Sequence, residues 1–204
     1  MVINFGVKMV NKLPNSIVEK VRSCEHCVKH LSHGARAIVQ VGENAKILIA
    51  GQAPGSKVHA SGIPFDDASG DRLRSWMGVD KAVFYDAEKI AILPMGFCYP
   101  GRGKSGDLPP RKECAELWRP DLLALMTQIQ LTLVIGQYAI AWHLPDTKKN
   151  NLTNTVKTWT KHWPTHLPLP HPSPRNNIWL KKNPWFDVEV VPILQDRVKV
   201  LLSS

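Results

Sequence analysis

The sequence predicts an α/β protein of three layers, α/β/α, in which helices cover both faces of a central four-stranded parallel sheet. Strand-like apolar runs recur along the chain, at residues 46–50, 90–93, 131–135 and 165–169. The first three runs are almost continuously apolar, as expected of parallel strands that are buried on both faces. Pro168 interrupts the fourth run, so that strand must be short or lie at an edge. Segments with helical spacing alternate with the runs, which is typical of the α/β class.

Each helix has its own signal. The first is predicted to begin at an N-cap, Asn15 or Ser16, and to end near residue 29. The second is predicted to begin at an N-cap at Ser69 and to end at Gly78. Two longer helices with a core-facing apolar spacing are predicted at residues 113–128 and 186–202.

The composition fits one domain with a polyanionic partner. A chain of 204 residues can bury one well-packed core, and we expect a single domain over residues 1–204. No apolar run reaches the length of about 18 residues that predicts a membrane span. The first 16 residues lack signal-peptide features, so we expect a cytoplasmic or nucleoid-associated protein. The net charge of +9 favours a polyanion such as DNA, although a merely solvated basic surface would have the same composition.

Four cysteines form a CxxC pair and two more distant positions: Cys24, Cys27, Cys98 and Cys114. A CxxC turn brings two sulphurs to one side, and in a cytosolic protein such a set indicates a metal site rather than disulphides. The spacing is compatible with a structural zinc ion and with a [4Fe–4S] cluster. The alternative without a cofactor is four independent buried cysteines.

Three unusual segments follow the ends of predicted strands: GQAPG at residues 51–55, PMGFC at 94–98 and HPSPRN at 171–176. Ligands of open parallel sheets bind beyond the carboxyl ends of the strands, so we expect the three segments to meet at one edge. The glycines around Pro54 favour a tight turn that exposes backbone amides. Two prolines stiffen the loop that carries His171. The loop at residues 99–110 is long enough to be functional.

In this order, the cysteines and the strand-end segments resemble the family-4 uracil-DNA glycosylases, the iron–sulphur class of that superfamily. The cysteine spacing looks like their cluster signature, and GQAPG followed by Gly62-Ile63-Pro64-Phe65 is similar to their first motif. The HPSP sequence is similar to their second motif. The resemblance spans residues 24–185 and implies a uracil-DNA glycosylase-like fold, a mainly structural [4Fe–4S] cluster, and DNA with a flipped damaged base as the partner. We expect a monomer.

The resemblance also implies roles for single residues. Phe65 would stack on the flipped base, unless it belongs to the core. The other base-binding residues are expected in the first motif: Gly51, Ala53 and Pro54. His171 would donate a hydrogen bond to the departing base, and Gln52 would hold the attacking water. Contacts to DNA are expected from the second motif and the basic, aromatic segment after it: Ser173, Arg175, Asn176 and Lys181.

Two departures from the family pattern matter for function. Gln52 stands where family 4 usually carries Glu, and an amide cannot act as a base. Asp66 and Asp67 are possible replacements, or simply loop and cap residues. Pro94 stands where family 4 has an asparagine that reads uracil, so the excised base is open: uracil, another deaminated base, or a base read through backbone groups.

Three other functions are compatible with parts of the sequence. A phosphate-binding loop at Gly103-Lys104-Ser105 is excluded because Cys98 replaces the required first glycine. A non-catalytic protein that binds DNA or DNA damage is the main alternative, and covalent capture of the sugar cation is a third. Because a mere binder needs neither His171 nor Phe65, the sequence favours a DNA N-glycosylase that hydrolyses the glycosidic bond of a deaminated base.

Overall fold

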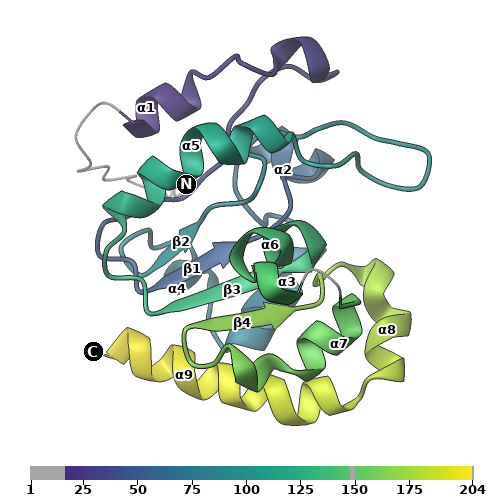
Figure 1. Cartoon of the computed structure of the whole chain (residues 1–204). Helices are drawn as coiled ribbons and strands as arrows, with labels where there is room; N and C mark the ends of the chain where they lie inside the picture. Colours follow the sequence, from purple (N-terminus) through teal and green to yellow (C-terminus); the bar gives the residue numbers. More distant parts are fainter. Residues whose placement is uncertain (1–16, 148–149, 204) are drawn as a thin grey trace, which may run out of the picture.

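The computed structural model describes residues 17–147 and 150–203, which form a four-stranded sheet flanked by helices (Figure 1). The strands are β1 (Ile47–Ala50), β2 (Ile90–Ile92), β3 (Leu131–Ile135) and β4 (His166–Leu169). All neighbours are parallel, in the order β2-β1-β3-β4. The predicted parallel sheet is confirmed, and β4 lies at an edge, as Pro168 requires.

Helices cover both faces of this sheet, which makes the three-layer α/β/α fold. One face packs against α3 (Ala68–Met77) and α9 (Val191–Ser203). The opposite face packs against α1 (Ile17–Arg22), α5 (Lys112–Leu125) and α6 (Gly136–His143). Shorter helices complete the chain: α2 (Ser56–Ser61), α4 (Lys81–Phe84), α7 (Leu152–Lys157) and α8 (Asn177–Lys182).

The alternation of side chains along β1 explains why both layers are needed. Ile47 and Ile49 belong to the apolar cluster that includes α3 and α9, whereas Leu48 belongs to the cluster with α1 and α5. Successive side chains of a strand point to opposite faces, so a fully apolar strand must be covered twice. All four residues of β1 are buried.

The first predicted helix is too long. α1 ends at Arg22, and a short 3₁₀ turn, Val28–His30, follows the CxxC pair. The Ser23 hydroxyl donates to the Glu19 carbonyl at 3.0 Å, a side-chain bond that competes with continuation of the helix. The predicted caps Asn15 and Ser16 lie outside the described residues.

The predicted N-cap of α3 is wrong by two residues. Asp67 is the N-cap, and its carboxylate accepts a hydrogen bond from the Gly70 amide at 3.0 Å. Ser69 lies inside the first turn and is buried. Both residue types favour caps, and only the path of the preceding chain decides between them. Gly78 ends the helix in the left-handed conformation, as predicted.

The two remaining helix predictions hold with shifted ends. The predicted helix at 113–128 is α5, which begins one residue earlier and ends at Leu125. The predicted C-terminal helix begins with a π-helical turn, Phe186–Val190, and continues as α9. Within the described residues, no helix combines the length and apolar character needed to cross a membrane.

Candidate active site

The first and second strand-end segments lie side by side, as predicted. The Met95 amide donates to the Gly51 carbonyl and the Gly96 amide to the Gln52 carbonyl, both at 2.9 Å. Parallel pairing therefore continues past the ends of β1 and β2. This places the GQAPG turn next to Pro94 at the carboxyl edge of the sheet.

The HPSP loop after β4 is fixed from within and from α3. The Asn176 side-chain amide donates to the His171 carbonyl at 2.7 Å. Arg72, on α3, donates to the Ser173 carbonyl at 3.1 Å and to the Asn177 side chain at 2.8 Å. Ser173 accepts a hydrogen bond from the Arg175 amide at 3.3 Å. Asn176 and Ser173, both predicted to contact DNA, thus also shape the loop that holds His171.

His171 is held as a neutral hydrogen-bond donor. The Ser173 backbone N–H donates to His171 Nδ1 at 3.2 Å, so the proton of the neutral ring is assigned to Nε2. Burial lowers the pKa of His171, and the nearby carboxylates of Asp67 and Asp107 oppose that shift only in part. A neutral imidazole with a free Nε2–H can donate to an oxygen that gains negative charge.

Phe65 occupies a strained backbone position next to the GQAPG turn. Its φ angle is +55°, the left-handed region that a bulky residue rarely adopts. The edge of its ring lies 3.6 Å from the position that a Cβ on Gly51 would occupy. On its other side the ring meets Phe84 edge-on, with centroids 6.2 Å apart. Phe65 is only partly buried, so it both packs against the core and borders the site.

The long loop is a hairpin that projects on the same side of the molecule as α8 (Figure 1). The Leu108 amide donates to the Gly101 carbonyl at 2.9 Å, and Arg102 and Asp107 form an isolated antiparallel bridge. The Gln52 side-chain amide reaches the Leu108 carbonyl at 3.5 Å. We call residues 99–110 the hairpin loop. Gln52, predicted to hold water, therefore has a contact with this loop.

A model of the uracil DNA glycosylase superfamily matches residues 39–195, well over half of this chain. The chain belongs to the uracil-DNA glycosylase superfamily. The matched region of this superfamily member contains the GQAPG turn, Phe65, the hairpin loop and the HPSP loop. Cys24 and Cys27 precede the matched region, so the match does not extend to the CxxC pair.

The four cysteines line one small cavity between α1, α5 and the end of β2. They form no disulphide. Two donors point at the sulphurs: the Trp118 indole N–H lies 3.3 Å from Cys24 Sγ, and the Phe97 amide lies 3.4 Å from Cys114 Sγ. Burial and the neighbouring thiols raise the pKa of Cys114 to about 12, and burial likewise raises the pKa values of Cys27 and Cys98.

The four thiols share one cavity, which does not by itself make a metal site. In the described part of the chain, no group of three or more His, Cys, Asp or Glu side chains is placed to hold a single metal ion. A bound metal would remove the protons that burial otherwise keeps on these thiols. The two N–H donors match the hydrogen bonds that stabilise metal-bound sulphur.

A buried arginine, which the sequence analysis did not single out, holds the end of β2 from behind. Arg119, on α5, has no exposed surface and donates to the carbonyls of Leu93 and Pro94, the latter at 2.9 Å. Its third partner is His143 Nε2 at 2.7 Å. The Pro94 carbonyl and the amides of Met95 and Gly96 are thus all engaged within the protein.

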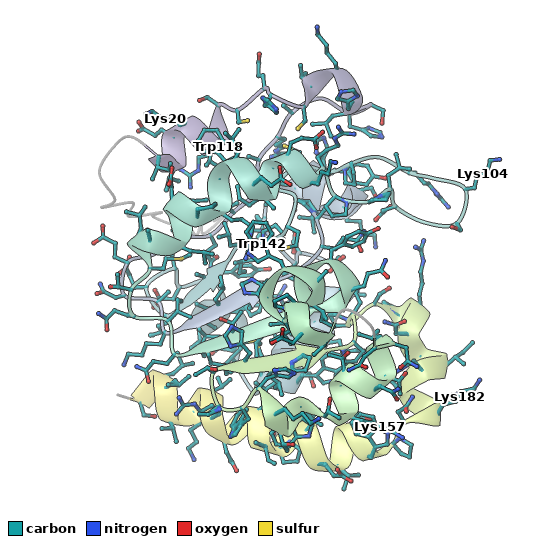
Figure 2. All side chains as sticks on the ribbon, viewed as in Figure 1. Lys20, Lys104, Trp118, Trp142, Lys157 and Lys182 are labelled. Carbon is teal, nitrogen blue, oxygen red and sulfur yellow. The ribbon has the colours of Figure 1, made fainter. Side chains whose placement is uncertain are left out.

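The predicted DNA-contacting side chains lie at the surface around the HPSP loop and α8. Arg175 and Lys181 are exposed. Lys104, at the tip of the hairpin loop, and Lys182, on α8, project on the same side in Figure 2. Ile178 lies between Arg175 and Lys181 in the sequence, on α8, with 68% of its surface exposed. This face combines positive charge with exposed apolar side chains, among them Ile178 and, in the hairpin loop, Leu108.

Proposed function

We propose that this superfamily member is a DNA N-glycosylase that hydrolyses the bond between a deaminated base and deoxyribose. The observation that carries the proposal is the state of His171, a neutral Nε2–H donor fixed at the carboxyl edge of the sheet. Phe65 and the GQAPG turn border the same edge.

The proposed chemistry begins with a base that has been flipped out of the stack. Phe65 offers its ring to the face of the base, and His171 Nε2 donates to the base oxygen that becomes negative as the glycosidic bond breaks. One such donor contributes about 10²–10³-fold to the rate in comparable oxyanion sites. His171 does not need to give up its proton for this effect.

DNA would bind across the HPSP loop and α8. Arg175, Lys181 and Lys182 are exposed there, and the chain carries a net charge of +9. Arg175 would fill the space that the flipped base leaves, because its planar guanidinium can stack as well as contact phosphate. Binding should therefore weaken steeply with salt.

Cys24, Cys27, Cys98 and Cys114 would hold a [4Fe–4S] cluster, with a structural zinc ion as the alternative. The shared cavity and the N–H donors to Cys24 and Cys114 support a thiolate-bound group. When bound, the cluster would tie the CxxC segment to α5 and to the end of β2. Iron and acid-labile sulphide in the purified protein, with broad absorption near about 400 nm, would support the cluster, and stoichiometric zinc would contradict it.

The residue at position 94 bears on which base is excised. Pro94 offers no side-chain hydrogen bond, and its carbonyl is engaged by Arg119. We therefore expect tolerance among uracil, hypoxanthine and xanthine rather than strict reading of uracil. The test is base release from oligonucleotides carrying each base, in single strands and in mismatched duplexes. Release of one base alone at a much higher rate would contradict this tolerance.

The second candidate function is a protein that binds damaged DNA without catalysis. Two observations favour it: Pro94 replaces the asparagine that reads uracil, and Gln52 replaces a carboxylate. Binding and base release, measured on the same oligonucleotides, distinguish the two functions. Tight binding to modified DNA without release of any base would support the binder and overturn the glycosylase.

A further inference from the structure

One carboxylate from the hairpin loop lies at the candidate active site. Asp107 Oδ2 lies 3.6 Å from the position that a Cβ on Gly55 would occupy, at the end of the GQAPG turn. Its other oxygen faces the Tyr99 hydroxyl at 3.4 Å. Tyr99 is buried, so it anchors one oxygen of a side chain that is itself exposed.

The hairpin loop that carries Asp107 is held against both motifs. On one side the Gln52 amide contacts the Leu108 carbonyl. On the other side a Cβ on Gly106 would lie 2.9 Å from Arg175 Nη1 in the HPSP loop. Gly106 has a φ of +151°, and the absence of a side chain lets Arg175 approach its backbone. Asp107 is thus positioned between the two motifs.

The other carboxylates near this edge have different partners. Asp67 caps α3 through the Gly70 amide. Asp66 adds its charge to burial, the larger cause, in raising the pKa of Tyr85, and Arg74 contacts the Tyr85 hydroxyl. Gln52 is an amide and cannot accept a proton. Asp107 combines a free carboxylate oxygen with a place beside the GQAPG turn, and, like Asp67, it is close enough to His171 to influence that imidazole electrostatically.

We propose that Asp107 is a catalytic residue of this enzyme, which binds the attacking water and accepts its proton. The inference rests on the glycosylase function proposed above. It supplies the carboxylate that the GQAPG turn lacks, from a different element of the chain. It also gives the hairpin loop a function, because this loop carries the carboxylate that accepts the proton.

The proposed step balances as follows in atoms and electrons. The C1′–N bond breaks, and its electron pair remains on the departing base, whose negative charge His171 stabilises. The water oxygen forms a bond to the cationic C1′, and one water proton moves to the Asp107 carboxylate and then to solvent. The base anion takes one proton from solvent. The products are a free base and an abasic sugar, and one water is consumed.

The substrate for the experiment is whichever of uracil, hypoxanthine and xanthine the wild-type protein releases fastest. Its single-turnover release rate is measured for the wild type and for each variant. The variants are Asp107→Asn, Asp67→Asn and, as a matched control, Asp121→Asn, an exposed carboxylate on α5. Asparagine keeps the shape at each position, and at Asp67 it keeps the helix cap. Binding of each variant to the same oligonucleotide is measured in parallel.

We expect Asp107→Asn to slow release by at least about 10²-fold, the range of a lost general base, without weaker DNA binding, since it removes a negative charge. Asp121→Asn should match the wild type. Tyr99→Phe, which keeps the fold but removes the anchoring hydroxyl, should slow release by a smaller factor, on the order of 10-fold.

Each other outcome overturns a defined claim. If Asp107→Asn releases the base at a rate within about threefold of wild type, the rate loss is much smaller than the loss of a general base would cause. That result overturns the role of Asp107 and leaves the proposed glycosylase function intact. A large loss in Asp67→Asn alone assigns the water to Asp67 instead. If the wild-type protein releases no base at all, the proposed function fails, and the role of Asp107 fails with it.

Discussion

At the scale of single residues, the function proposed for this chain depends on one hydrogen bond. The Ser173 amide points at His171 Nδ1, which leaves only Nε2 to carry the proton of the neutral ring. If Nδ1 of His171 were also protonated, its N–H would face the Ser173 N–H, and the hydrogen bond between them would be lost. Burial adds to this effect by disfavouring the charged ring, so the loop selects both the tautomer and the charge of His171.

This assignment predicts the titration of His171. Its pKa lies below the ordinary value of 6.5, so the ring should stay neutral down to mildly acidic pH and gain a proton only below that value. NMR of ¹⁵N-histidine-labelled protein, assigned by comparison with His171→Gln, should show a neutral Nε2–H ring at pH 7. A proton on Nδ1 at pH 7, or a pKa above 6.5, would contradict the assignment.

The sequence predicts the identity of His171 but not its state. The HPSP motif marks the histidine and a stiff loop around it. The donor to Nδ1 is a backbone amide two residues later, and its direction depends on the turn that Asn176 and Arg72 hold. Asp107 was missed for a similar reason, because nothing in GRGKSGDLPP shows that the chain folds back toward Gly55.

At the scale of elements, α3 is the support of the site. Its N-terminus packs so closely on the preceding chain that a Cβ on Gly70 would lie 1.7 Å from the Phe65 carbonyl oxygen. Arg74 on the same helix is buried, pairs with Asp71 at 2.6 Å and approaches the Phe65 carbonyl at 3.4 Å. The strained backbone of Phe65 is thus held by the first two turns of α3.

Gly70→Ala should therefore damage both stability and activity. The added methyl must push Phe65 away from the helix, and we expect a loss of about 1–3 kcal/mol in the free energy of unfolding. Base release should fall as well, because the ring moves. Denaturant unfolding checks the first effect and single-turnover release the second. Ala68→Ser, at an exposed position of the same turn, is the control, and equal behaviour of the two variants would refute this role of Gly70.

The elements differ in how well the sequence predicts them. The sheet is predictable because strands buried on both faces must be apolar along their length, as Ile47–Ala50 is. The end of α1 is not predictable from the sequence, because the hydrogen bond from Ser23 to Glu19 and the turn of the CxxC pair override the local helical pattern. The N-cap of α3 is ambiguous in the sequence for a different reason, because Asp67 and Ser69 are both residue types that favour N-caps.

At the scale of the whole molecule, a buried polar group joins the layers. Arg119 of α5 links the end of β2 to His143 of α6, and among the described residues no carboxylate forms an ion pair with it. Burial lowers the pKa of Arg119 to about 10, and burial together with Arg119 lowers the pKa of His143 to about 3. The sequence could not predict this group, because its members are far apart along the chain and meet only in the folded state.

The lowered pKa of His143 predicts acid sensitivity. Between about pH 6.5 and 3 the unfolded chain binds a proton at this histidine and the folded protein does not, so stability is lost as the pH falls through that range. The loss attributable to His143 should reach at most about 3 kcal/mol by pH 4. His143→Gln keeps an acceptor for Arg119 and does not titrate. Its free energy of unfolding should fall less steeply with acid, and a slope equal to that of wild type would contradict the prediction.

The most direct test of the central claim is single-turnover base release by the wild-type protein and by His171→Ala, with DNA binding and thermal melting measured on the same samples. We predict release by the wild type and a loss of about 10²–10³-fold in the variant, with binding and folding intact. Equal rates for the two proteins would remove His171 from the chemistry. Binding without release by either protein would show that this glycosylase fold only recognises DNA.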